Sequence, residues 1–307
     1  MARLTKRSWL LIALGVVAAL IVFAGSQWRA AIKRNRSVPD EPFRIAGNLY
    51  YVGATGVTSF LLTGPQGHVL IDGGYPETAP LIIASIRKLG FDIKDVKILL
   101  NSHAHSDHAG GLHELQQASG AQLWISEGDA EAVESGSGSD GALGRLRMLR
   151  GIGAFKMPAA RVDHRFKNGT KIQLGPIELT AHITAGHTRG CTSWSFPVRD
   201  GDRELLAVDV CSLTLFPGVS LVDPEAYPGI RSDFEHSFAT LRALPADIFL
   251  GSHGEFFDLN RKRRERATAT NPVEPFIDRG GYLSYIDSHE RRFRAVLAEQ
   301  APAQSSR

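Results

Sequence analysis

The sequence contains very little cysteine: only Cys191 and Cys211 occur among 307 residues. Two cysteines cannot form a disulfide scaffold, so stability must come from an apolar core, and the hydrophobic content of 43% allows one. The two cysteines lie almost symmetrically about a predicted turn at residues 199–202, and in a hairpin they would face each other. They form either a disulfide or two buried thiols. Two buried thiols are expected, because buried free cysteine is common.

A strong excess of charge of either sign is also absent. The formal net charge is +3, and Arg3, Lys6 and Arg7 account for it, since the remaining 32 basic residues balance 32 acidic ones. This balance gives no reason to expect a nucleic-acid partner. The chain also lacks internal repeats and the glycine pattern of a dinucleotide-binding βαβ unit, which excludes repeat architectures and that cofactor fold.

An uninterrupted apolar run from Trp9 to Gly25 follows the basic start. This pattern predicts a signal peptide over residues 1–24, cleaved after Ala24, with a retained inner-membrane anchor as the alternative because Lys33 and Arg34 follow the run. Residues 25–40 are expected to be a linker, 41–300 one domain and 301–307 a tail. The domain would then face an oxidising compartment, the periplasm.

Short β-type runs and helical patterns alternate along the domain. Strands are predicted at Leu49–Val52, Val57–Leu62, His68–Ile71, Val96–Leu100, Gln122–Ile125, Lys171–Leu174, Ile177–His182, Cys191–Val198, Glu204–Val210 and Asp247–Leu250. Helices are predicted at Thr78–Leu89, Ala109–Ala118, Phe234–Leu244 and Tyr282–Glu299, and a long mobile connection at Ser135–Gly144. Two β-rich halves, each followed by helices, predict an α/β fold in which two sheets pack together and helices cover them.

Four potential metal ligands, His103, His105, Asp107 and His108, occur within six residues directly after a predicted buried strand. His103 and His105 are two residues apart, so their imidazoles can point toward one ion. Asp107 and His108, at the start of the next helix, would turn toward a second ion. Nitrogen and oxygen ligands at this density suit zinc, and two ions roughly 3.5 to 4 Å apart form a hydrolytic site.

Two further histidines have a similar setting. His187 and His253 each follow a strand-like run and are flanked by glycine, which lets the backbone turn toward an ion. Both are therefore predicted as ligands. The other histidines lack this setting and are expected to be surface or hydrogen-bonded residues: His68, His113, His164, His182, His236 and His289.

The segment from His103 to His108, His-Ala-His-Ser-Asp-His, resembles the signature of the metallo-β-lactamase superfamily. Segments at residues 71–74, 186–188, 191–194 and 237–245 resemble the third subclass of class B β-lactamases, so the similarity spans roughly Phe43 to Leu297. The resemblance implies a four-layer αβ/βα sandwich with the metals at the edge between the sheets. It also implies a part in resistance to β-lactam antibiotics.

The resemblance assigns the ligands to two zinc ions. One ion would take His103, His105 and His187, and the other Asp107, His108 and His253. In the third subclass a serine replaces the cysteine ligand of the other subclasses, and Ser212 fits that position. The neighbouring Cys211 is expected to point away from the site because side chains alternate along a strand.

The implied reaction is zinc-dependent hydrolysis of the β-lactam ring of penicillins, cephalosporins and carbapenems by a metal-bound hydroxide, with Asp107 orienting that nucleophile. Ser212 and Thr214 resemble the positions that hydrogen-bond the substrate carboxylate. Asp72 is expected to orient a ligand histidine.

Phe155 and Met157 are expected to form an apolar flap over the substrate, with a packed loop as the alternative. Three departures from the family pattern, Ser106, Arg189 and Ala246, concern rigidity and the pocket wall rather than the metals.

Two other functions fit parts of the sequence. A glyoxalase II or lactonase would bridge its metals with an aspartate, and Asp209 is the candidate, although alternation places it on the opposite strand face from Ser212. A non-catalytic zinc-binding or membrane-associated scaffold would require closed metal sites, whereas six ligands for two ions leave open positions. The expected partner is a small molecule with a carboxylate, and the expected state is a monomer.

Overall fold

A computed structural model describes residues 38–138, 142–146, 148, 155–222 and 224–301, together with Gly25 and Gln27. The predicted signal peptide or anchor, residues 1–24, lies outside the described residues, as does most of the predicted linker and tail. Parts of the predicted connection and flap, residues 139–141 and 151–154, also lie outside them. Within the described ranges, no helix combines the length and apolar character that crossing a bilayer requires.

The first half of the domain forms a seven-stranded sheet in the order β1-β2-β3-β4-β5-β6-β7. Its strands are β1 (Phe43–Ala46), β2 (Leu49–Tyr51), β3 (Phe60–Leu62), β4 (His68–Ile71), β5 (Val96–Leu100), β6 (Gln122–Ser126) and β7 (His164–Phe166). Neighbours from β1 to β4 are antiparallel, and those from β4 to β7 are parallel. The carboxyl ends of β4, β5 and β6 therefore meet at one edge.

The second half forms a five-stranded sheet in the order β12-β11-β10-β9-β8. Its strands are β8 (Lys171–Leu174), β9 (Ile177–Ile183), β10 (Thr192–Asp200), β11 (Arg203–Val210) and β12 (Ile248–Gly251). β11 and β12 are parallel, while the other pairs are antiparallel. As a result β9, β11 and β12 run in the same direction and end at the same edge.

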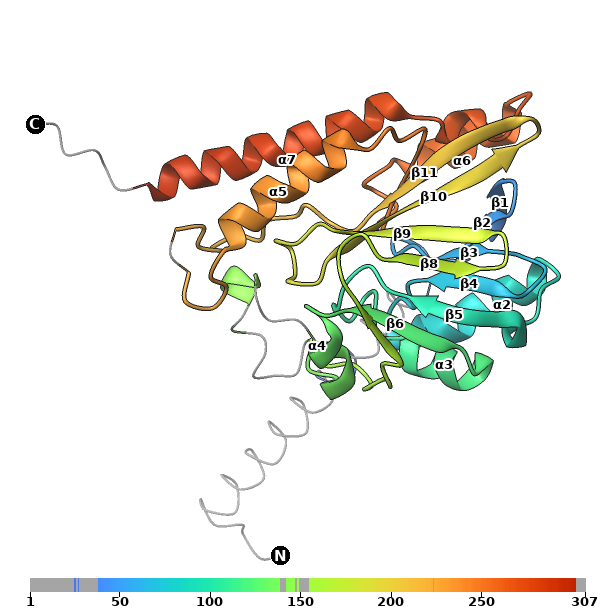
Figure 1. Ribbon diagram of the computed structural model, residues 1–307, viewed down its shortest axis with the longest axis horizontal. Helices are drawn as coiled ribbons and strands as arrows, with labels where there is room; N and C mark the ends of the chain where they lie inside the picture. The colour runs from blue at the N-terminus through green and yellow to red at the C-terminus, as the bar shows by residue number, and fades with distance from the viewer. Residues whose placement is uncertain are drawn as a thin grey trace, which may run out of the picture.

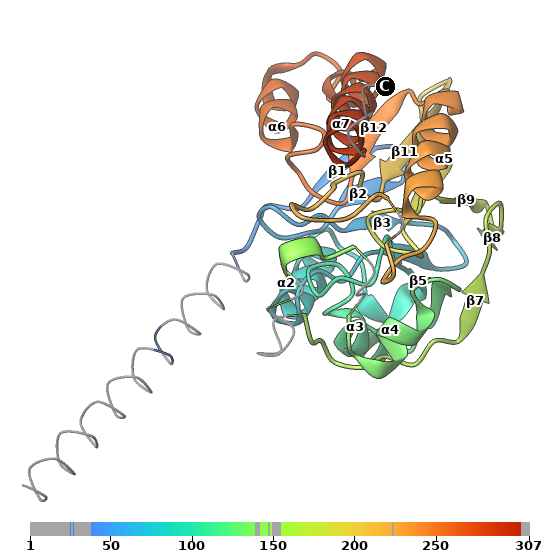
Figure 2. The same cartoon turned by 90° about the vertical axis from the view of Figure 1, so that its left-hand side faces the viewer.

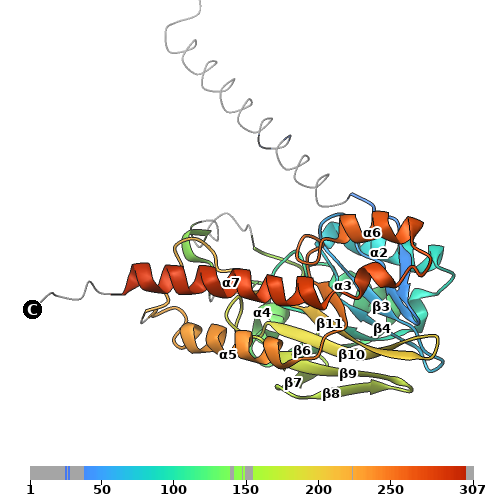
Figure 3. The ribbon, with the colours of Figure 1, turned by 90° about the horizontal axis from the view of Figure 1, so that it is seen from above.

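Helices cover the outer faces of both sheets (Figures 1 and 2). They are α2 (Ala79–Lys88), α3 (Leu112–Ser119), α4 (Ala130–Ser135), α5 (Ile230–Ala243), α6 (Leu259–Thr268) and α7 (Arg279–Gln300), with short 3-10 turns at Pro76–Thr78, Ile93–Asp95 and Glu274–Phe276. The first three lie on the seven-stranded sheet, and α5 and α7 lie side by side on the five-stranded one (Figure 3). This confirms the predicted four-layer αβ/βα sandwich.

Period-2 alternation distributes side chains between two buried clusters. In β3, Phe60 and Leu62 belong to the larger cluster between the sheets, which also contains Trp194 and Phe196 of β10. Leu61, on the opposite face of β3, packs in the cluster that α2 and α3 cover. The site edge is thus anchored on rigid, fully packed strands.

Most predicted elements are present, but four were not expected. β1, β7 and α4 are only three to six residues long, and α6 has no apolar periodicity because its sequence is mostly basic and polar. α3 also begins at Leu112 rather than Ala109. The backbone of residues 109–111 pairs with Gly74 instead: Ala109 forms an isolated parallel bridge with it, and the Gly111 amide donates to its carbonyl oxygen at 3.1 Å.

The predicted hairpin of β10 and β11 is present, but the expectation of two buried thiols is wrong. Cys191, just before β10, and Cys211, just after β11, form a disulfide. The antiparallel register brings the two ends of the hairpin together, with Trp194, three residues after Cys191, opposite Asp209, two residues before Cys211. Their Cα atoms are 5.9 Å apart, which is within the range that a disulfide spans.

Candidate metal centre

The predicted ligands lie on three loops at the common edge of the two sheets. The first loop follows β5 and carries His103, His105, Asp107 and His108; the second joins β9 to β10 and carries His187. The third loop follows β12 and carries His253. Asp107 and His108 lie in a turn before α3 and not at its start, because the helix begins four residues later.

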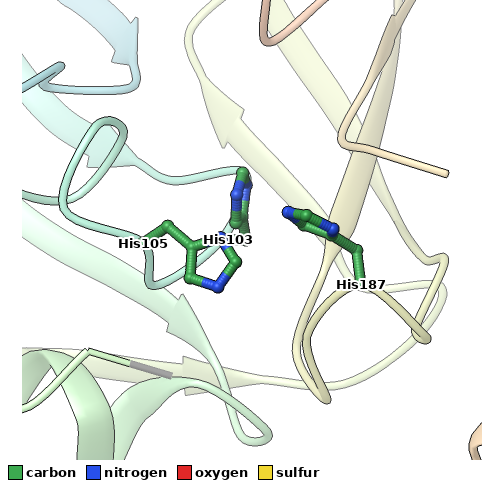
Figure 4. A group of neighbouring side chains, drawn as sticks. All are labelled: His103, His105 and His187. Carbon is green, nitrogen blue, oxygen red and sulfur yellow. The ribbon is translucent and has the colours of Figure 1, made fainter. Parts of the chain in front are cut away.

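One group consists of three imidazoles, which we call the first group: His103, His105 and His187. One nitrogen from each lies within 4.8 Å of the others. The ring centroids are 4.7 Å apart for His103 and His105, 4.9 Å for His103 and His187, and 4.7 Å for His105 and His187. Figure 4 shows the three rings facing a common space from both sides of the sandwich.

The second group consists of Asp107, His108 and His253, whose ligand atoms also lie within 4.8 Å of one another. Asp107 Oδ2 is 3.5 Å from His108 Nε2 and 3.5 Å from His253 Nε2, and the two Nε2 atoms are 3.0 Å apart. The two groups adjoin, because the ring centroids of His103 and His108 are 4.3 Å apart.

Protein acceptors hold the Nδ1 side of four of these imidazoles, which directs Nε2 toward the groups. Nδ1 of His187 contacts the Thr214 carbonyl oxygen at 2.8 Å, and Nδ1 of His253 contacts that of Gly56 at 3.2 Å. Nδ1 of His103 contacts Ser102 Oγ at 3.0 Å, and Nδ1 of His108 contacts Asp72 Oδ2 at 3.0 Å.

Asp72 supports one histidine of each group. It is buried, with a positive φ of 65°, and follows β4. Oδ1 accepts from the amide nitrogens of Asn101 and Ser102, and Oδ2 accepts from His108 and from the Ser102 hydroxyl. Since that hydroxyl donates to Asp72, it can accept from His103. The carboxylate therefore contacts a ligand histidine, His108, as predicted, and also reaches His103 through Ser102, which was not predicted.

The hairpin between β2 and β3 holds the loop of His253. Val57 forms an isolated antiparallel bridge with His253, and Thr58 donates through its hydroxyl to the Gly251 carbonyl at 2.8 Å. The backbone of Gly254 donates to Gly56 at 3.3 Å. The first sheet therefore positions a residue that the second sheet carries.

Burial and neighbouring charges set the protonation of the site. Burial lowers the pKa of His103 and of His187 well below the usual histidine value, and lowers that of His105 to about 4. Burial also lowers the pKa of His108, but Asp107 and Asp72 outweigh it and raise the pKa overall. The first group therefore presents neutral imidazoles at neutral pH, with lone pairs available to an ion.

The donor set fits zinc. Three neutral imidazoles form one group, and two imidazoles and a carboxylate form the other, which are the ligand types and numbers of zinc sites with open positions. The two groups also adjoin, as a two-metal site requires. The six residues that would hold the ions are those predicted from the sequence.

Of the predicted substrate-binding residues, Thr214 and Ser212 lie near the first group, whereas Met157 does not. Thr214 is half-buried beside the first group through its contact with His187, and Ser212 is buried with its Oγ accepting from the Thr214 amide at 3.2 Å. Met157 is not a flap residue: it is buried in the cluster beneath α4. Phe155 is half-buried, and the rest of the predicted flap, residues 151–154, lies outside the described residues.

The side chain of Cys211 does not point away from the site as expected. Its sulfur lies 3.6 Å from Nδ1 of His103 and 3.3 Å from the Ser102 carbonyl oxygen. Strand alternation fails here because β11 ends at Val210 and the chain leaves the sheet. The disulfide thus lies directly behind a predicted ligand.

Three residues near the groups were missed by the sequence reasoning. Phe216 lies with its ring centroid 5.0 Å from that of His187 and 6.1 Å from that of His105, and forms an apolar wall. The ring centroid of Phe256 lies 5.1 Å from that of His253. Asp129 accepts a hydrogen bond from the Ala104 amide. The only sequence signal for these three residues is that each lies in a loop that follows a strand.

The remaining histidines lie outside both groups: none of the six that were predicted to be structural occurs in a cluster of potential ligands within the described chain. Asp209 does not join either group. It is buried in β11, its Oδ1 has no hydrogen-bond partner among the described residues, and burial raises its pKa well above the usual value. Its position does not match that of a bridging ligand.

Comparison with solved structures gives similarity over nearly the whole domain. The native FEZ-1 metallo-beta-lactamase from Legionella gormanii is 39% identical, with 86% of this chain and 98% of that chain covered and a TM-score of 0.81. BJP-1, a subclass B3 metallo-beta-lactamase of Bradyrhizobium japonicum, is 35% identical, with 86% and 96% covered and a TM-score of 0.77.

A relative found by sequence comparison is named for a different hydrolase activity. The hydroxyacylglutathione hydrolase of Rhodopseudomonas palustris (strain BisB18) is 27% identical over 199 residues, which are 64% of this chain and 62% of that protein. The chain thus spans less than two thirds of the length of that relative. The family model of the Metallo-beta-lactamase superfamily matches residues 52–201. With the solved relatives covered almost completely, these findings show that the chain belongs to the metallo-beta-lactamase superfamily.

Proposed function

We propose that this chain is a dinuclear zinc β-lactamase that hydrolyses the ring of penicillins, cephalosporins and carbapenems. The observation that carries the proposal is the adjoining pair of groups, three imidazoles beside Asp107, His108 and His253, with no cysteine in the second group. The subclass B3 enzyme among the solved relatives supports this activity over the other hydrolases of the superfamily.

When bound, the ions would supply a water activated at neutral pH and electrophilic assistance to the amide. The first group would hold one ion and the second group the other. Asp107 is the acidic member, and its side chain is 23% exposed. Its carboxylate can therefore accept a hydrogen bond from the attacking water and orient it toward the lactam carbonyl.

The chain's own residues would bind the rest of the substrate. Thr214 and Ser212 offer hydroxyls to the substrate carboxylate, next to the first group. Phe216 provides an apolar surface against two ligand rings. A cavity of about 800 Å³ lies on the His253 side of the centre, with Val57 and Leu259 on its walls, and Ser212, Thr214 and Phe216 are not among its lining residues.

The test is turnover of one penicillin, one cephalosporin and one carbapenem by the purified domain, before and after chelation. The expected result is ring opening that a chelator abolishes and zinc restores. His105→Ala should lose turnover, whereas His113→Ala, which removes a half-buried histidine of α3 outside both ligand groups, should retain it. Absence of lactam turnover by the zinc-loaded protein would refute the proposal.

A thioesterase is the second candidate, because curated relatives are hydroxyacylglutathione hydrolases. The position of Asp209 argues against it, since this carboxyl belongs to neither ligand group. Hydrolysis of a glutathione thioester in the same preparation distinguishes the two functions. Thioester turnover without lactam turnover would select the thioesterase.

Export to the periplasm is part of the proposal, with residues 1–24 either cleaved or kept as an inner-membrane anchor. The disulfide between Cys191 and Cys211 supports it, because disulfides persist in oxidising compartments. We also propose that the chain is a monomer and has no nucleic-acid partner, and the balanced charge supports the second of these. The mass of the protein recovered from the periplasm would show whether the chain begins at residue 25.

A further inference from the structure

A buried carboxylate outside both ligand groups connects two of the ligand loops. Asp129 lies between β6 and α4 and is 1% exposed. Its Oδ2 accepts from the Ala104 amide at 2.8 Å and from the Thr188 hydroxyl at 2.8 Å. Its Oδ1 accepts from the Gly190 amide at 3.0 Å. Three donors from two loops therefore converge on one side chain.

These donors lie next to the first group in the chain. Ala104 separates His103 from His105, and Thr188 directly follows His187. The first loop belongs to the seven-stranded sheet and the second to the five-stranded one. Asp129 thus joins the two halves of the sandwich at the place where their imidazoles face each other (Figure 4).

The backbone around Asp129 leaves no space for an alternative arrangement. A Cβ at Gly190 would lie 2.2 Å from Ser126 Oγ and 2.5 Å from the Asp129 nitrogen, and one at Gly128 would lie 2.6 Å from the Arg189 carbonyl oxygen. The Ser126 hydroxyl also donates to the Gly190 carbonyl at 2.7 Å. Residues 126–129 and 188–190 are therefore held in one relative position.

We propose that Asp129 is a positioning residue for the first group, which fixes His187 relative to His103 and His105 and thereby sets the metal affinity of that group alone. The hydrogen bonds of Asp129 reach residues that directly adjoin the three ligands of the first group or lie within three residues of them, and none reaches the neighbours of His253. Those of Asp72 instead reach one histidine of each group. The inference rests on metal binding by the first group and not on the identity of the substrate.

The test measures zinc affinity of each group separately, by competition with a chromophoric chelator. His253→Ala leaves the first group intact, and His187→Ala leaves the second intact. We expect Asp129→Ala to lower zinc affinity about 10- to 100-fold in the His253→Ala protein and to leave it unchanged in the His187→Ala protein. Asp129→Asn should have a smaller effect, because its one oxygen can still accept from Ala104 and Thr188.

Asp163→Asn is the matched control. Like Asp129, Asp163 accepts from a backbone amide, that of Leu123 at 2.9 Å, but its hydrogen bonds reach no ligand loop. It should change neither affinity. Two outcomes would overturn the proposal and give Asp129 a purely structural role. One is an equal loss of zinc affinity in the His253→Ala and His187→Ala proteins. The other is a lower free energy of unfolding in urea for the metal-free protein, with no change in zinc affinity.

Thr188 provides an independent variant if Asp129→Ala does not fold. Thr188→Val removes one of the three hydrogen bonds without changing the size of the side chain, and Thr188→Ser restores the hydroxyl. A lower affinity of the first group in Thr188→Val that Thr188→Ser recovers supports the proposal. Wild-type affinity in both variants contradicts it.

Discussion

At the scale of single residues, the site depends on how each imidazole is held as much as on its presence. Asp72 and the carbonyl groups of Gly56 and Thr214 accept from Nδ1 atoms, which leaves Nε2 for an ion. Asp72 has a left-handed backbone conformation that aspartate and asparagine tolerate better than most residues. The residue type is thus restricted both by its backbone and by the donors around it.

Asp72→Asn tests this support while preserving the backbone conformation. If its oxygen remains against Asn101 and the Ser102 amide, its NH₂ faces Nδ1 of His108. His108 must then carry its proton on Nε2, so we expect a loss of zinc affinity of the second group of about 10- to 100-fold. Chelator competition measures it. A zinc affinity of the second group equal to that of the Asp163→Asn reference would show that Asp72 does not set the tautomer of His108.

The pH dependence of stability follows from the His105 pKa, which burial lowers from 6.5 to about 4 in the metal-free protein. Between these values the unfolded chain binds more protons, so this contribution is present above pH 6.5 and is lost as the pH falls toward 4. Between pH 7 and pH 5 the wild type should lose about 2 kcal/mol more stability than His105→Ala. Urea unfolding after chelation measures this, and equal pH dependences would contradict it.

At the scale of elements, parallel strands place the ligand loops and tight contacts fix them. β4 and β5 end next to each other, which brings Asp72 beside the loop of His103 and His108. The hairpin of β10 and β11 is closed by the disulfide, whose Cys211 sulfur lies 3.6 Å from His103 Nδ1. The element that forms the centre of the second sheet therefore also supports a ligand of the first.

Replacing both Cys191 and Cys211 by alanine should lower the free energy of unfolding. The disulfide has a sequence separation of 20 residues, and a closed loop of this size corresponds to about 3 kcal/mol. Urea unfolding of the oxidised wild type and the double variant gives the difference. In metal-free protein, dithiothreitol should destabilise the wild type and leave the variant unchanged; a response of both to the reductant would exclude the disulfide as its cause.

At the scale of the whole molecule, the centre joins the two halves of the sandwich. His103, His105, Asp107 and His108 come from the first half, and His187 and His253 from the second. Bound ions would therefore link the two sheets across their common edge. Binding energy at such a site adds to the stability of the entire fold, because the unfolded chain does not hold the six ligands together.

Removal of metal should lower the melting temperature of the whole domain in one transition. Zinc at about 1,000 times its dissociation constant adds about 4 kcal/mol of stability per site. Calorimetry with and without a chelator measures the change. The double variant His187→Ala and His253→Ala, which lacks one ligand of each group, should lose most of the chelator response; a full response would place the metal elsewhere.

The sequence by itself determined the fold class and singled out the six side chains that the structure brings together in two groups. The strand periods, and a cluster of four ligand types after a buried strand, are local signals, and local patterns are readable without coordinates. It could not determine the disulfide or the burial of Met157. It also gave no sign of the support from Asp129 and Phe216. The aligned strands of one hairpin bring the two cysteines together, Met157 enters a buried cluster, and Asp129 and Phe216 contact loops of other elements. Only tertiary packing decides such contacts, because they join residues that are distant in the chain without any periodic pattern.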